Sequence, residues 1–414
     1  MAPPAPTEPK RHSTELKRSV SLPLLVLYGL GTTVGAGIYV LIGEVAGLAG
    51  VLAPVAFLVA ALLAAPTAFA FGELSARYPR SAGEAVYVSA GFGAPWLATF
   101  VGLLVALVGI VSSAAIANGF VGYARHFIDL PAGAIITILV VLLGAVAAWG
   151  ITESVALAAT VTLVEIAGLL LVIVVGVGGD TDAVIIPSEA VPLDWVVVSG
   201  VLAGAILAFY AFLGFEDMVN LAEEVRDAPR VMPQAIIITL AITGVLYVAV
   251  ATIAVRVVPL DLLAGAEAPL ALVYRHATGG SANMISAIGA VAVINGALIQ
   301  IIMASRVLYG LSNQGWLPRL FAWLHPRTRT PVVATAFVSV LVLALALALT
   351  LVRLAELTST ITLIIFALVN LALMRVKART APPAGIQIIP YWVPAVGFVV
   401  SSSFAVYQLS RYIL

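Results

Sequence analysis

Eleven apolar segments, each about long enough to cross a lipid bilayer, constrain this chain more than any other feature of its sequence. A transmembrane helix needs about 20 largely apolar residues. The segments lie at residues 22–43, 50–71, 96–121, 132–149, 155–178, 195–216, 235–256, 284–309, 332–351, 357–374 and 391–410. Inside lipid, only helices and closed barrels satisfy all backbone polar groups. The sequence therefore predicts an all-α polytopic membrane protein with about eleven transmembrane helices.

The composition agrees with a membrane protein and argues against several other classes. Charged residues make up 10% of the 414 residues, whereas soluble domains carry about 25%. Twenty basic and twenty acidic residues cancel, so nothing predicts nucleic-acid binding. There is no cysteine, and the four histidines lack metal-ligand spacing. We expect no metal and no cofactor, and the lack of a nucleophile–base set predicts that the protein is not an enzyme.

The distribution of basic residues predicts an orientation in the membrane. Lys10, Arg11, Lys17 and Arg18 precede the first segment, and such clusters mark the cytoplasmic side. Alternation of the segments from there puts fifteen of the twenty basic residues on the cytoplasmic side. We expect an integral protein of the plasma membrane whose N-terminus is cytoplasmic, with the last residue outside after an odd number of spans.

Two of the segments contain glycine where a helix would otherwise continue. The first holds Gly29, Gly31, Gly35 and Gly37. Each glycine costs about 1 kcal/mol of helix propensity relative to alanine. Small residues also permit close helix packing, but four in nine residues favour an unwound stretch near Val34–Gly37. In the sixth segment, Gly214 interrupts the aromatic run Phe209–Glu216. Interrupted helices at matching positions of two halves indicate a transporter site.

The spacing of these two helices predicts how the chain is divided. The sixth segment begins five spans after the first, so a repeat of five spans is inverted in the membrane. We expect a cytoplasmic tail at 1–21, a first five-helix repeat at 22–178, a second at 195–375, and an additional helix at 390–414. Unwound backbone is tolerated at membrane depth only beside a cavity or within protein. Its free N–H groups attract a carboxylate, and its carbonyl groups attract an ammonium.

Four sequence motifs occur in a characteristic order. They lie at 35–43 (Gly-Ala-Gly-Ile-Tyr-Val-Leu-Ile-Gly), 71–87, 209–224 with Pro229, Arg230 and Pro233, and 304–312 with Leu317 and Pro318. Together they resemble the amino acid–polyamine–organocation superfamily, and within it the cationic-amino-acid-transporter-like permeases. The resemblance implies a LeuT-type five-plus-five inverted repeat with broken helices 1 and 6 and a central site that faces each side in turn. Family members usually have twelve helices, one more than this chain.

The resemblance also implies where the substrate binds. The site residues that it carries over are Thr33, Gly35, Ala36, Gly37 and Ile38 in the first helix and Tyr210, Ala211, Phe212, Leu213 and Gly214 in the sixth. In the family, backbone atoms at these breaks hold the two charged ends of an amino acid. An aromatic side chain near Tyr210 would close over it. Asn295 in the eighth segment either lines the same site or bridges two helices.

Glu165 is a lone carboxylate near the middle of the fifth segment. A charge at the bilayer centre costs between about 3 and 17 kcal/mol and usually marks an ion or substrate pathway. Many proton-coupled relatives have lysine here, so glutamate departs from the family pattern. Glu165 would bind the coupling proton or ligate a cation, or else pack in neutral form. No serine or threonine lies between Ile288 and Ile302, where sodium-coupled relatives place hydroxyl groups, so sodium is disfavoured and a proton is predicted.

These observations predict a secondary active transporter, or permease, that moves an amino acid by alternating access as a symporter or antiporter. The alternatives are an amino acid/polyamine exchanger, a channel, and a transport-inactive sensor or subunit with the same fold. A cationic substrate would require an acidic pocket. Carboxylates near the span ends, such as Glu84 and Glu216, are expected to be solvated. With Glu165 as the one buried candidate, the sequence favours a neutral amino acid.

Overall fold

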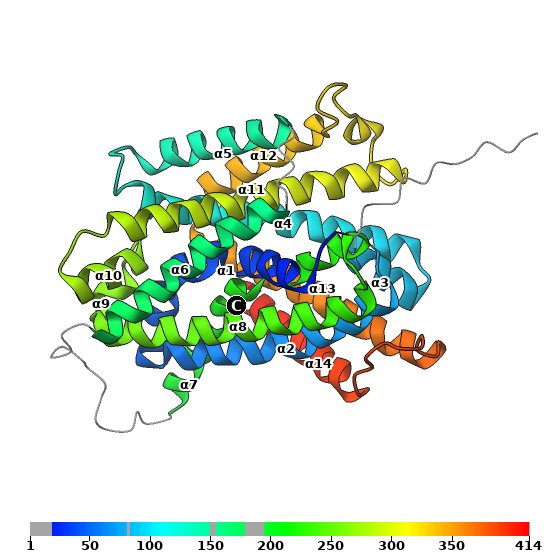
Figure 1. The fold of residues 1–414 in the computed structure, drawn as a ribbon, viewed down its shortest axis with the longest axis horizontal. Helices are drawn as coiled ribbons and strands as arrows, with labels where there is room; N and C mark the ends of the chain where they lie inside the picture. The colour runs from blue at the N-terminus through cyan, green and yellow to red at the C-terminus, as the bar shows by residue number, and fades with distance from the viewer. Residues whose placement is uncertain (1–18, 81–82, 150–154, 179–193, 414) are drawn as a thin grey trace, which may run out of the picture.

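The computed structural model describes residues 19–80, 83–149, 155–178 and 194–413, which form a bundle of helices (Figure 1). Within these ranges, β pairing is limited to one bridge between Val20 and Val225. The eleven predicted segments correspond to α1 (Leu22–Ala49), α2 (Ala53–Arg77), α4 (Pro95–Ala124), α5 (Ala132–Trp149), α6 (Val155–Gly178), α7 (Trp195–Phe212), α8 (Ala228–Val257), α11 (Asn283–Asn313), α12 (Val332–Ala348), α13 (Leu351–Arg379) and α14 (Trp392–Ile413). The predicted all-α polytopic membrane protein is confirmed. The predicted tail lies almost wholly outside the described residues.

Most helices extend beyond the apolar segments that predicted them. In the described part of the chain, nine helices are long and apolar enough to cross a membrane, and Leu22–Gly35 and Val332–Ala348 are shorter apolar helices. α2 continues to Arg77, and α13 begins at Leu351. Hydropathy marks only the part of a helix inside lipid, so charged helical ends are not recognised from the pattern.

Several predicted loops contain short helices. These are α3 (Gly83–Phe92), η2 (Glu216–Glu224), α9 (Leu260–Ala264), α10 (Pro269–Thr278) and η3 (Arg319–Ala322). A further short helix, η1 (Gly50–Leu52), lies at the start of the predicted second segment. α3 and η2 are important for the site because they approach the same end of the bundle. α9 and α10 lie at the opposite end (Figure 1).

Local sequence explains where the helices begin and bend. Proline occupies the first turn of α1, α2, α4, α8 and α10, where its missing N–H would have no intrahelical partner. Asp194 caps α7 by accepting a hydrogen bond from the backbone N–H of Val197 at 2.8 Å. Pro66 and Pro233 lie inside α2 and α8, at positions where proline removes a backbone bond.

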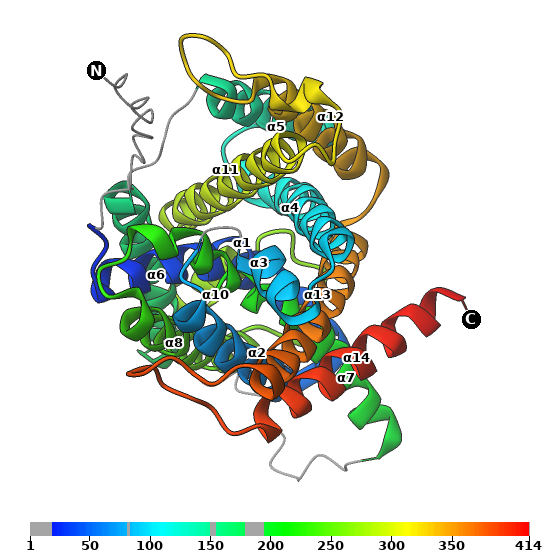
Figure 2. The same ribbon diagram turned by 90° about the vertical axis from the view of Figure 1, so that its right-hand side faces the viewer.

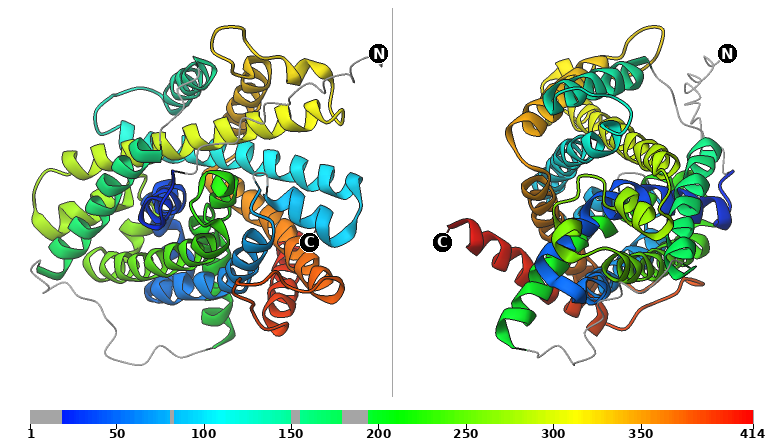
Figure 3. Two further views of the ribbon diagram at one scale, coloured as in Figure 1. Left: turned by 45° about the vertical axis from the view of Figure 1, so that its right-hand side comes forward. Right: turned by 90° about the vertical axis from the view of Figure 1, so that its left-hand side faces the viewer.

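The helices pack in matched pairs. α5 and α12 lie at one edge of the bundle, and α14 lies at the other (Figure 2), while α1 passes through the middle (Figure 3). α1 packs on α7, α2 on α8, α4 on α11, and α5 on α12. If α1, α2, α4, α5 and α6 are matched in order with α7, α8, α11, α12 and α13, several contacts between the two halves have a counterpart with the halves exchanged. The contact α1–α8 matches α2–α7, α4–α12 matches α5–α11, and α4–α13 matches α6–α11. A twofold relation between two five-helix halves would produce this pattern.

One end of the bundle is covered by α9 and α10, here called the α9–α10 cap. α9 contacts α1, and α10 contacts α1 and α6. Gly122, near the end of α4, has no room for a side chain because the backbone of Glu267 occupies that space. The Arg125 guanidinium forms an ion pair with the Glu267 carboxylate at 2.7 Å, and both side chains are exposed. The segment between α9 and α10 therefore contacts the end of α4 through both packing and an ion pair.

Candidate functional site

α1 is interrupted at one residue in the middle of the bundle. Gly35 has φ −28° and ψ −116°, which is not helical, and the helix continues on both sides. One turn before the break, the Thr32 and Thr33 hydroxyls both donate to the carbonyl oxygen of Gly29, at 3.0 and 2.8 Å. The break predicted near Val34–Gly37 is confirmed, and it is confined to a single non-helical residue.

The break after α7 is larger. Leu213 is extended (φ −67°, ψ 143°), and Gly214 has φ +124°, a region that favours glycine because it has no Cβ. The carbonyl oxygen of Gly214 accepts hydrogen bonds from the Thr32 hydroxyl at 2.9 Å and from the backbone N–H of Asp217 at 3.1 Å. Its N–H donates to a carboxylate oxygen of Glu216 at 2.8 Å. The chain then continues as η2, a 3₁₀ segment.

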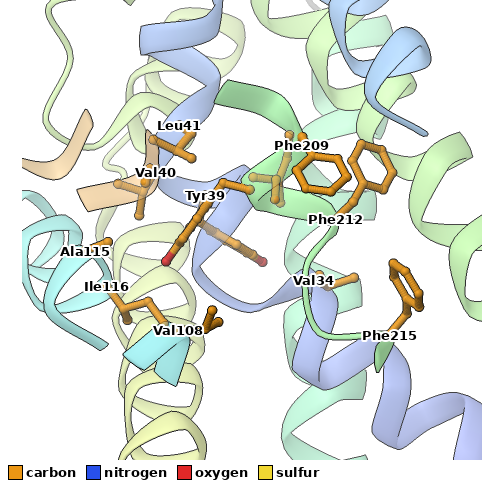
Figure 4. Close-up of a cluster of buried hydrophobic side chains, with 14 of the residues drawn as sticks. Val34, Tyr39, Val40, Leu41, Val108, Ala115, Ile116, Phe209, Phe212 and Phe215 are labelled. Atoms are coloured by element: carbon orange, nitrogen blue, oxygen red, sulfur yellow. The ribbon is translucent and has the colours of Figure 1, made fainter. Parts of the chain in front are cut away.

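A single side chain of α8 joins the two breaks. The Tyr247 hydroxyl lies 2.7 Å from the carbonyl oxygen of Thr33 and 2.9 Å from that of Ala211, so its single O–H is shared between these two acceptors. A Cβ at Gly37 would lie 2.5 Å from the Cα of Ala211, so the chains approach too closely for a side chain. Figure 4 shows the loop after α7 running beside the interrupted part of α1.

A cavity lies where the two breaks meet. Its volume accessible to water is about 50 Å³, enough for a few water molecules. It is lined by Thr32, Thr33, Gly37, Glu84, Val105, Val108, Ser112, Ile116, Tyr210, Leu213, Glu216, Asp217, Gly296, Ile299, Gln300, Met303, Thr358, Thr362, Ile365 and Phe366. It therefore extends from the two breaks to α3, between α4, α11 and α13.

The predicted substrate residues divide into two groups. Thr33, Gly37, Tyr210 and Leu213 line the cavity, whereas Gly35, Ile38, Ala211, Phe212, Gly214 and Asn295 do not. The side chain of Ala36 is outside the described part of the structure. Within the second group, Gly35 and Gly214 form the breaks themselves, and Ala211 packs against Gly37. The Tyr210 hydroxyl forms a hydrogen bond with the Ser112 hydroxyl at 3.0 Å, which connects α7 to α4 at the cavity.

Glu165 is fully buried, but it lies outside the cavity. The amide of Asn295 on α11 donates to one of its carboxylate oxygens at 3.3 Å. The Tyr39 hydroxyl of α1 donates to its backbone carbonyl oxygen at 2.6 Å. Glu165 and Asn295, which the sequence assigned to different roles, therefore belong to one polar group between α6, α1 and α11.

Three further carboxylates line the end of the cavity nearest α3. Glu84, Glu216 and Asp217 are 4%, 8% and 6% exposed. The amide of Gln300 donates to a carboxylate oxygen of Asp217 at 3.1 Å. Burial raises the pKa of the Glu84 carboxyl to about 8; its own backbone N–H opposes this rise, and the charge of Asp217 adds to it. We call these three carboxylates and Gln300 the acidic pocket.

The acidic pocket corrects the prediction that Glu84 and Glu216 are solvated and that Glu165 is the one buried carboxylate. Glu84 is buried because α3 lies against α4 and α13. Glu216 and its neighbour Asp217 are buried because η2 turns under the break instead of leaving the bundle. The consecutive acidic residues directly after Gly214-Phe215 were the one sequence signal for this pocket.

Comparisons with known proteins agree on one family. Residues 22–411 match the family described as amino acid permease. A vacuolar cationic amino acid transporter 4 of Arabidopsis thaliana is 30% identical over 410 residues, which cover 90% of this chain and 65% of the relative. The branched-chain amino acid permease BcaP of Bacillus subtilis is 29% identical over 407 residues, covering 91% and 85%. The methylthioribose transporter of Bacillus subtilis is 28% identical over 388 residues, covering 89% and 83%. The chain spans less than two thirds of the length of the Arabidopsis relative.

Proposed function

Because this chain belongs to the amino acid permease family, we propose that it is a secondary active transporter that moves an amino acid across a membrane. The observation that carries the proposal is the cavity where the interrupted α1 and α7 meet, lined by Gly37 and Leu213. The second half of α1 begins there, and a helix N-terminus favours a carboxylate. Backbone carbonyl groups at the breaks favour an ammonium. The two ends of an amino acid would bind to these groups.

Alternating access is proposed as the mechanism. The matched contacts of α1 to α6 with α7 to α13 support two inverted repeats at 22–178 and 195–375, with α14 outside them. Repeats that rock against each other around a fixed site expose that site to each side in turn. The α9–α10 cap would have to separate from α4 for the site to open at that end. The protein is an integral membrane protein, and we propose a plasma-membrane location with a cytoplasmic N-terminus.

Coupling to protons is proposed at Glu165. The burial of Glu165 supports this role. So do its hydrogen bonds from Asn295 on α11 and from Tyr39 on α1, because both helices also contribute to the cavity. A change in their packing would change the environment of the carboxyl, and the coupling between substrate and proton binding is reciprocal. Sodium is disfavoured by the lack of hydroxyl side chains between Ile288 and Ile302.

Uptake into proteoliposomes tests both proposals. The purified protein is screened against the twenty amino acids and common amines, with and without a pH gradient across the membrane. We expect uptake of at least one amino acid, and accumulation driven by the gradient. Uptake indistinguishable from empty liposomes for every compound would contradict the transport proposal.

The variant Glu165→Gln then separates coupling from transport, because glutamine mimics the protonated carboxyl. We expect this variant to keep exchange of labelled for unlabelled substrate at near wild-type rate but to lose accumulation driven by the pH gradient. If Glu165→Gln still concentrates substrate in response to the gradient, Glu165 is not the proton carrier.

A further inference from the structure

The acidic pocket offers hydrogen-bond acceptors without a matching cation. Glu84, Glu216 and Asp217 contribute carboxylates, and no ion pair of theirs is found among the described residues. The side chain of Thr362, which lines the same cavity, is 2% exposed, and its hydroxyl has no hydrogen-bond partner within the described ranges. The carbonyl oxygen of the Gln300 side chain also lacks one there. Unsatisfied buried polar groups are costly, so these groups indicate a ligand that donates hydrogen bonds.

Glu73 is a buried carboxylate with a structural role, and its contacts differ from those of the acidic pocket. Glu73 is fully buried on α2, and its two carboxylate oxygens accept from Arg77 at 2.7 Å and Lys377 at 2.6 Å. The backbone N–H of Ile389 donates to it as well, at 2.9 Å. A buried charge is tolerated when it is paired and hydrogen-bonded in this way. The three carboxylates of the acidic pocket accept from the Gln300 amide and the backbone N–H of Gly214, and no basic side chain in the described ranges pairs with them. This arrangement is therefore not a structural ion pair.

Three carboxylates that line one small cavity do not all remain ionised without a cation. Like charges at one site raise the affinity for protons, and the group titrates as a unit. The charges of Glu216, Asp217 and Glu84 act on one another. No set of three acidic, histidine or cysteine side chains in the described ranges is placed to hold a metal ion. Without a bound cation, the acidic pocket therefore retains a proton.

The shape of the cavity indicates what could replace this proton. Its lining includes apolar side chains, among them Val105 and Val108 on α4 and Ile299 and Met303 on α11. A solute that lies along them would place a methylene chain against these side chains. Its amino-acid end would lie at the breaks, and its other end would reach the carboxylates.

On these grounds, and given the proposed transport function, we propose that the acidic pocket binds the distal ammonium or guanidinium group of the solute in exchange for a proton. The titratable groups that line the cavity are Glu84, Glu216, Asp217 and Tyr210. Tyr87 of α3 is the further titratable group that interacts with Glu84. The basic residues Arg77 and Lys377 of α2 and α13 are paired with Glu73, and Arg375 of α13 donates to the carbonyl oxygen of Gly91.

The proposed exchange releases one proton for each cationic group bound, and it predicts the direction in which affinity changes with pH. One carboxyl O–H bond breaks as the cationic group enters, and the proton leaves to solvent. Below the pKa of the pocket the proton occupies it, so affinity for a cationic solute should rise with pH. With the pKa of Glu84 raised to about 8, this rise continues up to about pH 8 and levels off above it, and release of one proton corresponds to about tenfold per pH unit on the acid side. A carrier that holds either a proton or a cationic solute is an antiporter.

Proton release on binding tests the proposal directly. The full-length protein, purified in detergent in a weakly buffered solution with a pH-sensitive dye, is titrated with lysine and, for comparison, with leucine. We expect about one proton released per lysine bound and none for leucine. Glu84→Gln and Asp217→Asn should each abolish the release and weaken lysine binding at least tenfold more than leucine binding. Asp129→Asn, an exposed acidic residue after α4, is the matched control and should behave as wild type.

Each outcome decides between the proposals. Lysine binding without proton release, or leucine binding and uptake without lysine binding, would overturn the exchange at the acidic pocket and leave the transport function intact. Unchanged proton release in both carboxylate variants would also overturn it. Should the protein bind neither probe and transport no amino acid in proteoliposomes, the proposed function itself fails, which is a different result.

Discussion

The two interrupted helices meet at one cavity and share the Tyr247 hydroxyl, but they are broken in different ways. In α1 only Gly35 leaves the helical region, and a Cβ added there would meet nothing closer than 3.8 Å. After α7, Leu213 and Gly214 both leave it, and the chain continues as a 3₁₀ segment. A Cβ at Gly214 would overlap the carbonyl group of Thr32. The α1 break is therefore a local bend, whereas the α7 break is fixed by packing against α1.

The largest effect is expected from Gly214→Ala, which tests whether the α7 break is fixed. Its φ of +124° is a region in which non-glycine residues are strained by about 1–3 kcal/mol, and the overlap with Thr32 adds to that cost. We expect loss of uptake and a lowered thermal unfolding temperature, measured on purified protein. A stable variant with wild-type uptake would show that the α7 break is as adaptable as that of α1.

Gly37→Leu tests the point where the two broken chains touch. Because even a Cβ would lie 2.5 Å from the backbone of Ala211, leucine must separate α1 from α7 and fill the cavity that Gly37 lines. We expect uptake to fall to background. Gly310→Leu on α11, where an added Cβ meets nothing within 4 Å, is the control and should retain uptake.

Tyr247→Phe removes the one hydroxyl that the two breaks share. The carbonyl oxygens of Thr33 and Ala211 would lose this donor inside the protein, which costs about 1–3 kcal/mol. We expect a lower unfolding temperature and weaker substrate affinity, with protein that still folds. Tyr407→Phe, on the exposed face of α14, is the matched control. Equal unfolding temperatures for the two variants would mean that Tyr247 does not hold the breaks together.

Gly35→Ala should have the smallest effect and would sharpen the comparison most. The added methyl group fits, and alanine favours a continuous helix by about 1 kcal/mol over glycine. We expect normal folding and a modest reduction in uptake rate, several-fold at most. Loss of folding comparable to that of Gly214→Ala would contradict the view that the α1 break is a local bend.

The sequence predicted the parts of this fold that depend on local composition. The lengths of the apolar segments predicted the eleven helices, and Gly35 and Gly214 indicated the two breaks. Both signals depend on a few neighbouring residues. The ends of α2 and α13 were missed because charged helical turns near the membrane surface resemble loops in hydropathy.

The site was less predictable because its contents depend on contacts between distant segments. Glu84 faces the cavity only because α3 packs on α4 and α13, and Asn295 faces Glu165 because it lies on a different side of α11 from Gln300. The resemblance to a known family assigned substrate-binding roles to residues around the breaks. It did not predict the acidic pocket, in which Glu84 and Asp217 come from two predicted loops and Glu216 is the last residue of the predicted sixth segment.

The ion pair between Arg125 and Glu267 has a consequence for how the closed end is maintained. Both side chains are exposed, at 40% and 59%, and exposed pairs contribute only about 0.2–1 kcal/mol. Such a contribution changes the ratio of closed to open molecules roughly 1.4- to 5-fold, far less than a full population shift requires. Dissolved salt screens the pair further. In the proposed alternating-access cycle, this ion pair would therefore add little to the free energy needed to open this end, and a higher ionic strength of the surrounding medium would lower that contribution further.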